Sequence, residues 1–89
     1  ALNRLGVLHL QRGEYAAAAT FMAAAVKAVP EDPVRHSNLA SALRRLNRLP
    51  DALNACRQAL RLAPDFTDGL VNLVNILDQM QRPGDAVAA

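Results

Sequence analysis

The sequence contains few of the residue types on which covalent cross-links, stacking sites and membrane spans depend. Its single cysteine, Cys56, cannot form a disulfide within the chain. Aromatic residues make up 3% of the chain, and the net charge of +2 is too small to predict a polyanionic partner. The longest stretch almost free of polar residues, 16–26, is well short of the roughly 20 residues that span a bilayer. We therefore expect no disulfide framework, no membrane span and no nucleic-acid site.

Apolar residues other than aromatics make up nearly half of the chain. They bring the apolar fraction to 52%, largely through alanine and leucine, which are among the best helix formers. A length of 89 residues argues for one domain at most, and we expect it to be all-helical and soluble. No initiating methionine or cleavable leader pattern stands at the start, so we take the chain as a segment of a longer protein. No targeting signal identifies a compartment, and the cytoplasm is favoured.

A shift of the sequence by 34 residues brings many identical residues into coincidence, which indicates an internal repeat. Leucine and alanine are common, so each match alone is weak, but two prolines fall into the same register. The coincident residues are Leu5, Leu39 and Leu73; Ala18, Ala52 and Ala86; Ala25 and Ala59; Pro30 and Pro64; and Asn38 and Asn72.

The sequence predicts two helices in each repeat, because apolar residues recur at the i, i+3, i+4, i+7 spacing of a helix face. Gly13 ends the first helix, and Asp32 before Pro33 is a good N-cap followed by a first-turn proline. By the same reasoning Pro50 starts a helix. The predicted first helices cover 1–12, 34–46 and 68–80, and the second helices cover 15–28 and 50–62, with another beginning near Gly84.

The 34-residue unit resembles the tetratricopeptide repeat, a helix–turn–helix with the pattern W-x2-L-G-x2-Y, then A-x3-F, then P. The matching residues are Leu2, Leu5, Gly6, His9, Ala18, Met22 and Pro30; then His36, Leu39, Ala40, Leu43, Ala52, Cys56 and Pro64; then Leu70, Leu73, Val74, Leu77 and Ala86. Leucine, histidine, methionine and cysteine replace the aromatic residues of the pattern. The resemblance implies an all-α fold, a right-handed α-solenoid of antiparallel helix pairs with about two and a half repeats. We expect one domain over 1–89, divided into repeats at 1–32 and 33–66 and a partial repeat at 67–89.

Small residues in this pattern allow two antiparallel helices to approach closely. We expect Gly6 to face Ala18, and Ala40 to face Ala52, where two antiparallel helices approach closely. A larger side chain at such a contact would overpack it, typically at a cost of about 1–3 kcal/mol.

The residues able to support catalysis fall on packing positions of the repeat. These are His9, His36 and Cys56, and no phosphate loop, nucleophile motif or metal-ligand spacing accompanies them. We therefore predict no catalytic, cofactor-binding or metal-binding residues, and no enzyme activity in this segment.

The basic run Arg44, Arg45 and Arg48 is the densest charge in the chain. A nucleic-acid surface would repeat such a patch along one face and add aromatic residues for stacking. The equivalent positions in the neighbouring repeats are Leu10, Gln11 and Glu14, and Asp78, Gln79 and Arg82. The basic stripe does not continue, so these arginines are interpreted as a solvated rim that can meet an acidic group of a partner protein.

Polar residues recur on the first helices, which line the concave groove in solenoids of the family that this chain resembles. Asn38 and Asn72 occupy one position of the repeat, Ser41 and Asn75 another, and Arg4 stands at the first of these positions in the first repeat. An asparagine amide offers a donor and an acceptor, so a ladder of amides can hold the backbone of an extended peptide. The predicted peptide-binding residues are Arg4, Asn38, Ser41, Arg45, Asn72 and Asn75. The alternative that these asparagines simply face water remains open.

Three functions follow from this interpretation. The first is a module that binds an extended protein or peptide segment. The second rests on the stretches "HSNLASAL" and "APDFTDGLVNLVNIL", which are similar to the asparagine-ladder arm of the O-linked N-acetylglucosamine transferases. That similarity implies a substrate-presenting arm of a larger glycosyltransferase. The third is a self-assembly module that forms a homo-oligomer through the apolar surface of the partial third repeat.

The sequence argues against one class of ligand, the C-terminal carboxylates of chaperones. Tetratricopeptide clamps for the C-terminal carboxylates of chaperones use lysine and arginine beside asparagine. Here Asp68 and Asn72 stand where such a clamp places its cations. An acidic residue at that position repels a carboxylate.

Overall fold

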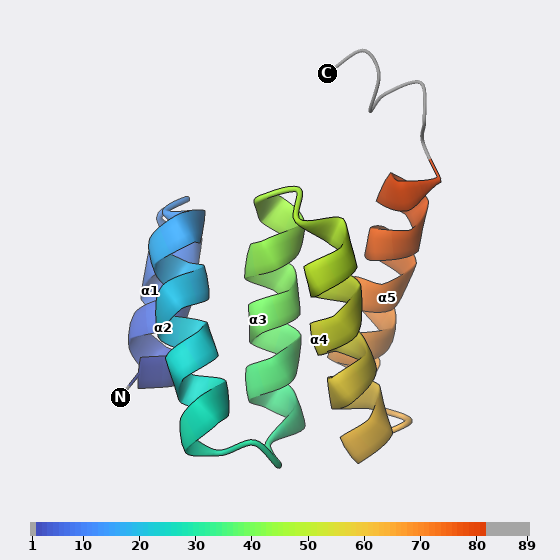
Figure 1. Cartoon of the computed structure of the whole chain (residues 1–89), viewed down its shortest axis with the longest axis horizontal. Coiled ribbons are helices and arrows are strands. Elements are labelled where there is room, and N and C mark those ends of the chain that lie inside the picture. The colour runs from blue at the N-terminus through green and yellow to red at the C-terminus, as the bar shows by residue number, and fades with distance from the viewer. Residues whose placement is uncertain (1, 82–89) are drawn as a thin grey trace.

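A computed structural model of the chain describes residues 2–81, with side chains from Leu5 onward. Within this range it consists of α-helices and contains no strand, which confirms the all-α prediction (Figure 1). The helix expected near Gly84 lies outside the described residues. The helices are α1 Leu2–Gln11, α2 Tyr15–Ala28, α3 Pro33–Arg45, α4 Leu49–Leu62 and α5 Thr67–Met80.

The helices form two layers that follow from the alternation of first and second helices. α1 pairs with α2 and α3 with α4, and α5 packs against both α3 and α4. Figure 1 shows the helices side by side, with α3 between α2 and α4. The first helices α1, α3 and α5 also contact one another in sequence, and together they make one layer. α3 is the central element, since it packs against each of the other four helices.

Residues at the helix ends explain where the elements begin and stop. The Asp32 Oδ1 accepts a hydrogen bond of 3.0 Å from the Val34 N–H, and Pro33 opens α3 as predicted. Gly13 and Asn47 adopt positive φ angles of 78° and 60° after α1 and α3, a backbone conformation that glycine and asparagine tolerate best. α4 begins at Leu49, so Pro50 occupies its second position, one residue later than expected, where the missing N–H is still harmless.

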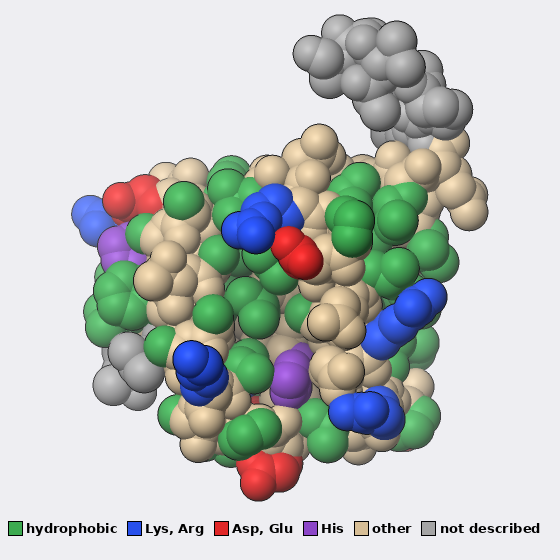
Figure 2. Space-filling model, viewed as in Figure 1, with side chains coloured by type: hydrophobic (Ala, Val, Ile, Leu, Met, Phe, Trp, Pro, Cys, Tyr) green, Lys and Arg blue, Asp and Glu red, His purple; other side chains and the backbone are tan. Residues whose placement is uncertain are grey.

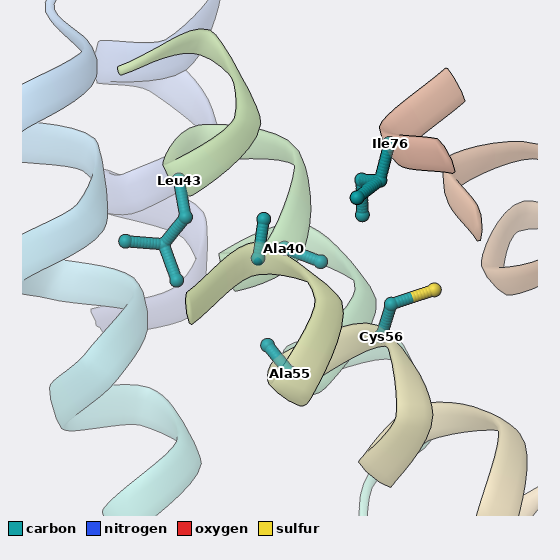
Figure 3. Close-up of a cluster of buried hydrophobic side chains, with 6 residues drawn as sticks. Ala40, Leu43, Ala55, Cys56 and Ile76 are labelled. Atoms are coloured by element: carbon teal, nitrogen blue, oxygen red, sulfur yellow. The ribbon is translucent and has the colours of Figure 1, made fainter. Parts of the chain in front are cut away.

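The core is built mainly from alanine, and the paired helices are correspondingly close. A Cβ atom added to Gly6 would lie 2.7 Å from the Met22 Cγ and 3.4 Å from the Ala18 carbonyl oxygen, as the expected contact of Gly6 with α2 requires. Around the second pair, Ala40 and Ala52 are fully buried in one cluster (Figure 3). That cluster consists of Ala40, Leu43, Ala52, Ala55, Cys56 and Ile76, and a second consists of Ala18, Met22 and Ala42.

One side of α5 stays apolar and exposed. Leu70, Val74 and Leu77 are 43%, 65% and 38% exposed. One repeat earlier the same positions are His36, Ala40 and Leu43 of α3, which are at most 9% exposed because α4 packs beside them. Exposure on α5 therefore follows from the absence, among the described residues, of a helix equivalent to α4.

The tight contact between α1 and α2 predicts a strong effect of added volume at a single alanine. Ala18→Leu is expected to lower the free energy of unfolding by about 1–3 kcal/mol, because Ala18 is fully buried beside the α1 backbone. Ala23→Leu adds the same side chain to the same helix at an exposed position, and its expected effect is within about 0.5 kcal/mol. Urea denaturation followed by far-UV circular dichroism measures both. Equal stability of the two variants would contradict the packing described here.

Candidate functional site

A polar hollow lies between α3 and α5, where two first helices meet. Its volume is about 190 Å³. Three of the predicted peptide-binding residues, Asn38, Ser41 and Asn72, come together here. The complete lining is Ser37, Asn38, Ser41, Asp68, Val71 and Asn72.

Asn72 bridges the two helices. Its Nδ2 donates to the Ser37 carbonyl oxygen at 3.0 Å and to the Ser37 Oγ at 2.8 Å. Ser37 is 3% exposed, so this contact lies at the floor of the hollow. Both of these bonds engage the same nitrogen, and the Oδ1 of Asn72 is an acceptor that it can offer to a ligand. Sequence reasoning treated Asn72 as a ligand contact and missed this bridging role.

The other predicted contacts are distributed around the hollow. Asn75 is half-buried on α5 but does not line it. The Arg45 guanidinium lies 5.6 Å from the centroid of the Tyr15 ring, and its Nη1 donates to the Tyr15 hydroxyl at 3.4 Å. This cation is thus held over the start of α2. Arg4 belongs to α1, and its side chain lies outside the described residues.

A second bridge joins α3 to α5 nearer their C-terminal ends. The Arg44 Nη1 donates to the Gln79 Oε1 at 3.1 Å. Burial, and then the neighbouring charge of Arg45, lowers the pKa of the Arg44 guanidinium. Ser37–Asn72 and Arg44–Gln79 are each 35 residues apart, one residue more than the repeat length. That spacing is the signal from which these bridges are predictable.

The residues with catalytic potential have structural contacts. The His36 Nε2 donates to the Pro30 carbonyl oxygen at 2.7 Å, and His36 is 9% exposed. The His9 ring stacks on Phe21 with centroids 5.2 Å apart, and its Nδ1 lies 3.3 Å from the Glu14 Oε1. The Cys56 thiol is fully buried and donates to the Gly69 carbonyl oxygen at 3.0 Å. The side chains of His9 and Cys56 therefore connect neighbouring helices, and that of His36 fastens α3 to the turn before it.

The part of the chain that the structure describes contains neither a cluster of metal-ligating residues nor a helix able to span a membrane. No group of three or more histidine, cysteine, aspartate or glutamate residues lies close enough there to hold a metal ion. Within the same residues, each helix is too short or too polar to cross a bilayer.

A larger hollow of about 560 Å³ lies on the other layer, between α2 and α4. It is visible near the centre of Figure 2, with apolar side chains at its floor. At its rim the Arg48 Nη2 lies 3.2 Å from the Asp51 Oδ2, so these two charges neutralise each other. The hollow is lined by Ala16, Ala19, Thr20, Ala23, Leu39, Leu43, Leu46, Arg48 and Asp51. With so few polar groups it suits an extended backbone less well than the hollow between α3 and α5.

Family models described as tetratricopeptide repeat match residues 1–33 and 33–66. The chain belongs to the tetratricopeptide repeat family. The matches and the two-layer fold confirm the predicted tetratricopeptide solenoid of about two and a half repeats. They give no support for a specific kinship with O-linked N-acetylglucosamine transferases, and no curated protein sequence matches the chain.

Solved structures of tetratricopeptide domains resemble this one closely. The first tetratricopeptide domain of Spaghetti (RPAP3), bound to the HSP90 peptide SRMEEVD, is 26% identical with a TM-score of 0.87. That match covers 91% of this chain and 64% of the other, so the present chain spans slightly less than two thirds of that domain. The TPR2B domain of yeast Sti1, in a complex with an Hsp70 peptide, is 24% identical with a TM-score of 0.85. That match covers 97% of this chain and 70% of the TPR2B chain. At 24% identity the likeness concerns the fold alone.

The bridge between Asn72 and Ser37 predicts a loss of stability when the amide is removed. Asn72→Ala is expected to lower the free energy of unfolding by about 1 kcal/mol, because a half-buried amide that donates two hydrogen bonds is lost. Asn54→Ala makes the same change at an exposed position of α4 and is expected to stay within about 0.5 kcal/mol. Chemical denaturation of both variants is the measurement. An unchanged free energy of unfolding in Asn72→Ala would show that the bridge does not hold α5 to α3.

Burial raises the pKa of the Cys56 thiol, which predicts a pH dependence of stability. The unfolded chain loses this proton above an ordinary cysteine pKa of about 8.5 while the folded chain keeps it. The stabilising contribution is therefore complete at neutral pH and declines as the pH rises past this value. The urea midpoint of the unaltered chain should fall more steeply between pH 8 and pH 10 than that of Cys56→Ala. Parallel pH profiles would show that the thiol titrates alike in both states.

Proposed function

We propose that this chain is a non-catalytic protein-interaction module that holds an extended segment of a partner protein along its layer of first helices. The observation that carries the proposal is the hollow between α3 and α5, in which amide, hydroxyl and carboxylate groups of Asn38, Ser41, Asp68 and Asn72 converge. Membership of a family of solenoids that expose such a layer is consistent with it.

The groups in the hollow suit a peptide backbone. An extended segment presents an unpaired N–H and C=O at each residue, and both need partners once they leave water. Amide and hydroxyl side chains supply acceptors and donors without demanding a particular sequence. Val71, 52% exposed at the edge of the hollow, adds an apolar contact for a neighbouring side chain. The expected binding is therefore weak and tolerant of sequence.

The peptide-bound domain of Spaghetti supports the class of ligand, since a protein of closely similar fold is bound there to a short peptide. Its peptide, SRMEEVD, is acidic. The carboxylate of Asp68 in the hollow disfavours such a ligand here, in agreement with the exclusion drawn from the sequence. This likeness therefore supports a peptide ligand, whereas the charge of Asp68 argues against an acidic one.

Removal of polar groups from the hollow tests the proposal. The 89-residue chain is used to select binders from a library of random decapeptides, and their affinities are measured by fluorescence anisotropy. Asn38→Ala combined with Ser41→Ala should weaken binding about fivefold or more, because each lost hydrogen bond is worth roughly 0.5–1.5 kcal/mol. Asn72 is kept in this variant, so that the bridge to Ser37 remains.

The matched control is Thr20→Ala combined with Asn54→Ala, two exposed polar residues on the other layer. This control should bind like the unaltered chain, and circular dichroism establishes that both doubly substituted chains are folded. Unchanged affinity of the Asn38/Ser41 variant, or equal losses in the two doubly substituted chains, would remove the hollow as the binding site. Failure of the unaltered chain to yield any decapeptide binder would reject the peptide-binding function itself.

A further inference from the structure

The hollow between α3 and α5 carries a negative charge without a local counter-charge. Asp68 is exposed in the first turn of α5 and is the charged residue in the lining. Among the side chains that the structure describes, no lysine or arginine forms a salt bridge with it. A cation supplied by a ligand therefore meets an available carboxylate.

The arginines of α3 are held by other contacts. Arg35 binds the Asp32 carboxylate at 3.3 Å and the Ala25 carbonyl oxygen at 3.0 Å. Arg44 and Arg45 donate to Gln79 and Tyr15, as described above. None of the three lines the hollow, so the positive net charge of the chain does not extend to this site.

Oxygen acceptors from several residues line the hollow, beside the donors of the Asn38 amide and the Ser41 hydroxyl. The Nδ2 of Asn72 donates to Ser37, and the Oδ1 of the same amide is an acceptor. The carboxylate of Asp68 accepts only, and the Ser41 hydroxyl adds an oxygen with two lone pairs. A ligand group with several N–H donors can pair with these acceptor oxygens.

We infer that the hollow receives a lysine or arginine side chain, so that the module prefers basic over acidic protein segments. This inference rests on the proposed peptide-binding function and names the class of segment. An ammonium brings three donors and a guanidinium five, and neither has an acceptor. The exposed side chain of Val71 beside Asp68 offers an apolar surface for the methylene stem of such a residue.

The expected preference opposes the overall charge of the protein. A net charge of +2 attracts acidic segments at long range, so a preference for basic segments has to originate at the site. Because Asp68 is exposed, its contribution to affinity is modest, about twofold to fivefold, and it decreases as salt screens the charge.

The test repeats the decapeptide selection with the unaltered 89-residue chain, with Asp68→Asn and with Asp68→Lys. Lysine and arginine should be enriched at one position of the peptides that the unaltered chain selects. A selected peptide should bind Asp68→Asn about twofold to fivefold more weakly, with the difference shrinking between 50 mM and 500 mM salt. Asp68→Lys should select aspartate or glutamate at that position instead.

The matched control is Asp65→Asn, which removes the same charge from an exposed loop residue outside the lining and should leave the enrichment intact. Binders without enrichment of basic residues, or equal losses in Asp65→Asn and Asp68→Asn, would overturn the inference while leaving the peptide-binding function in place. A chain that selects no binder at all overturns both. Circular dichroism at the assay temperature establishes that each variant is folded.

Discussion

The rest of the structure depends on the close approach of paired helices at small residues. At Gly6 the neighbouring helix is so near that an added Cβ atom would meet Met22, and in the second pair Ala40 and Ala52 are fully buried. Helices packed this tightly bury surface with little side-chain volume, which is why a chain with 3% aromatic residues builds a core at all. Because the first two repeats place small residues at the same positions, their helix pairs pack alike, and the first helices α1, α3 and α5 form one layer. The polar hollow exists because α3 and α5 are neighbours in that layer.

The architecture could be predicted from the sequence almost completely, for physical reasons that are local. The repeat length of 34 residues fixes the element order, and residues such as Asp32, Pro33 and Gly13 fix the helix ends through capping and backbone conformation. The predicted ends of the five described helices lie within one residue of the observed ends. Pro50, for example, takes the second position of α4, because either of the first two positions of a helix accepts a residue without an N–H. Signals of this kind involve neighbours in sequence, and tertiary packing here reinforces them without overriding them.

The site could be predicted only in part, because its chemistry depends on contacts between repeats. The repeat pattern brings Asn38, Ser41 and Asn72 to one place, as their position on the first helices implies. The 35-residue spacing allows Asn72 to reach Ser37 in the neighbouring repeat, but only the packing of α5 against α3 determines that its amide bonds there. Arg45 illustrates the same difficulty, because its position in the repeat is compatible with the groove while its cation lies over Tyr15. A repeat assigns a residue to a face, and the neighbouring repeat determines which of its polar groups remain available.

This distinction bears on how one fold serves different ligands. The peptide-bound tetratricopeptide domain of Spaghetti shares this fold with a TM-score of 0.87 although only 26% of the compared residues are identical. In the present chain, the Nδ2 of Asn72 is engaged by Ser37, and the arginines of α3 are held outside the hollow. The carboxylate of Asp68 and the Oδ1 of Asn72 are groups that a ligand can still contact. Selectivity in such a groove is therefore set by the polar groups that the fold has not already paired, so a residue's internal partners must be known before its role toward a ligand is assigned.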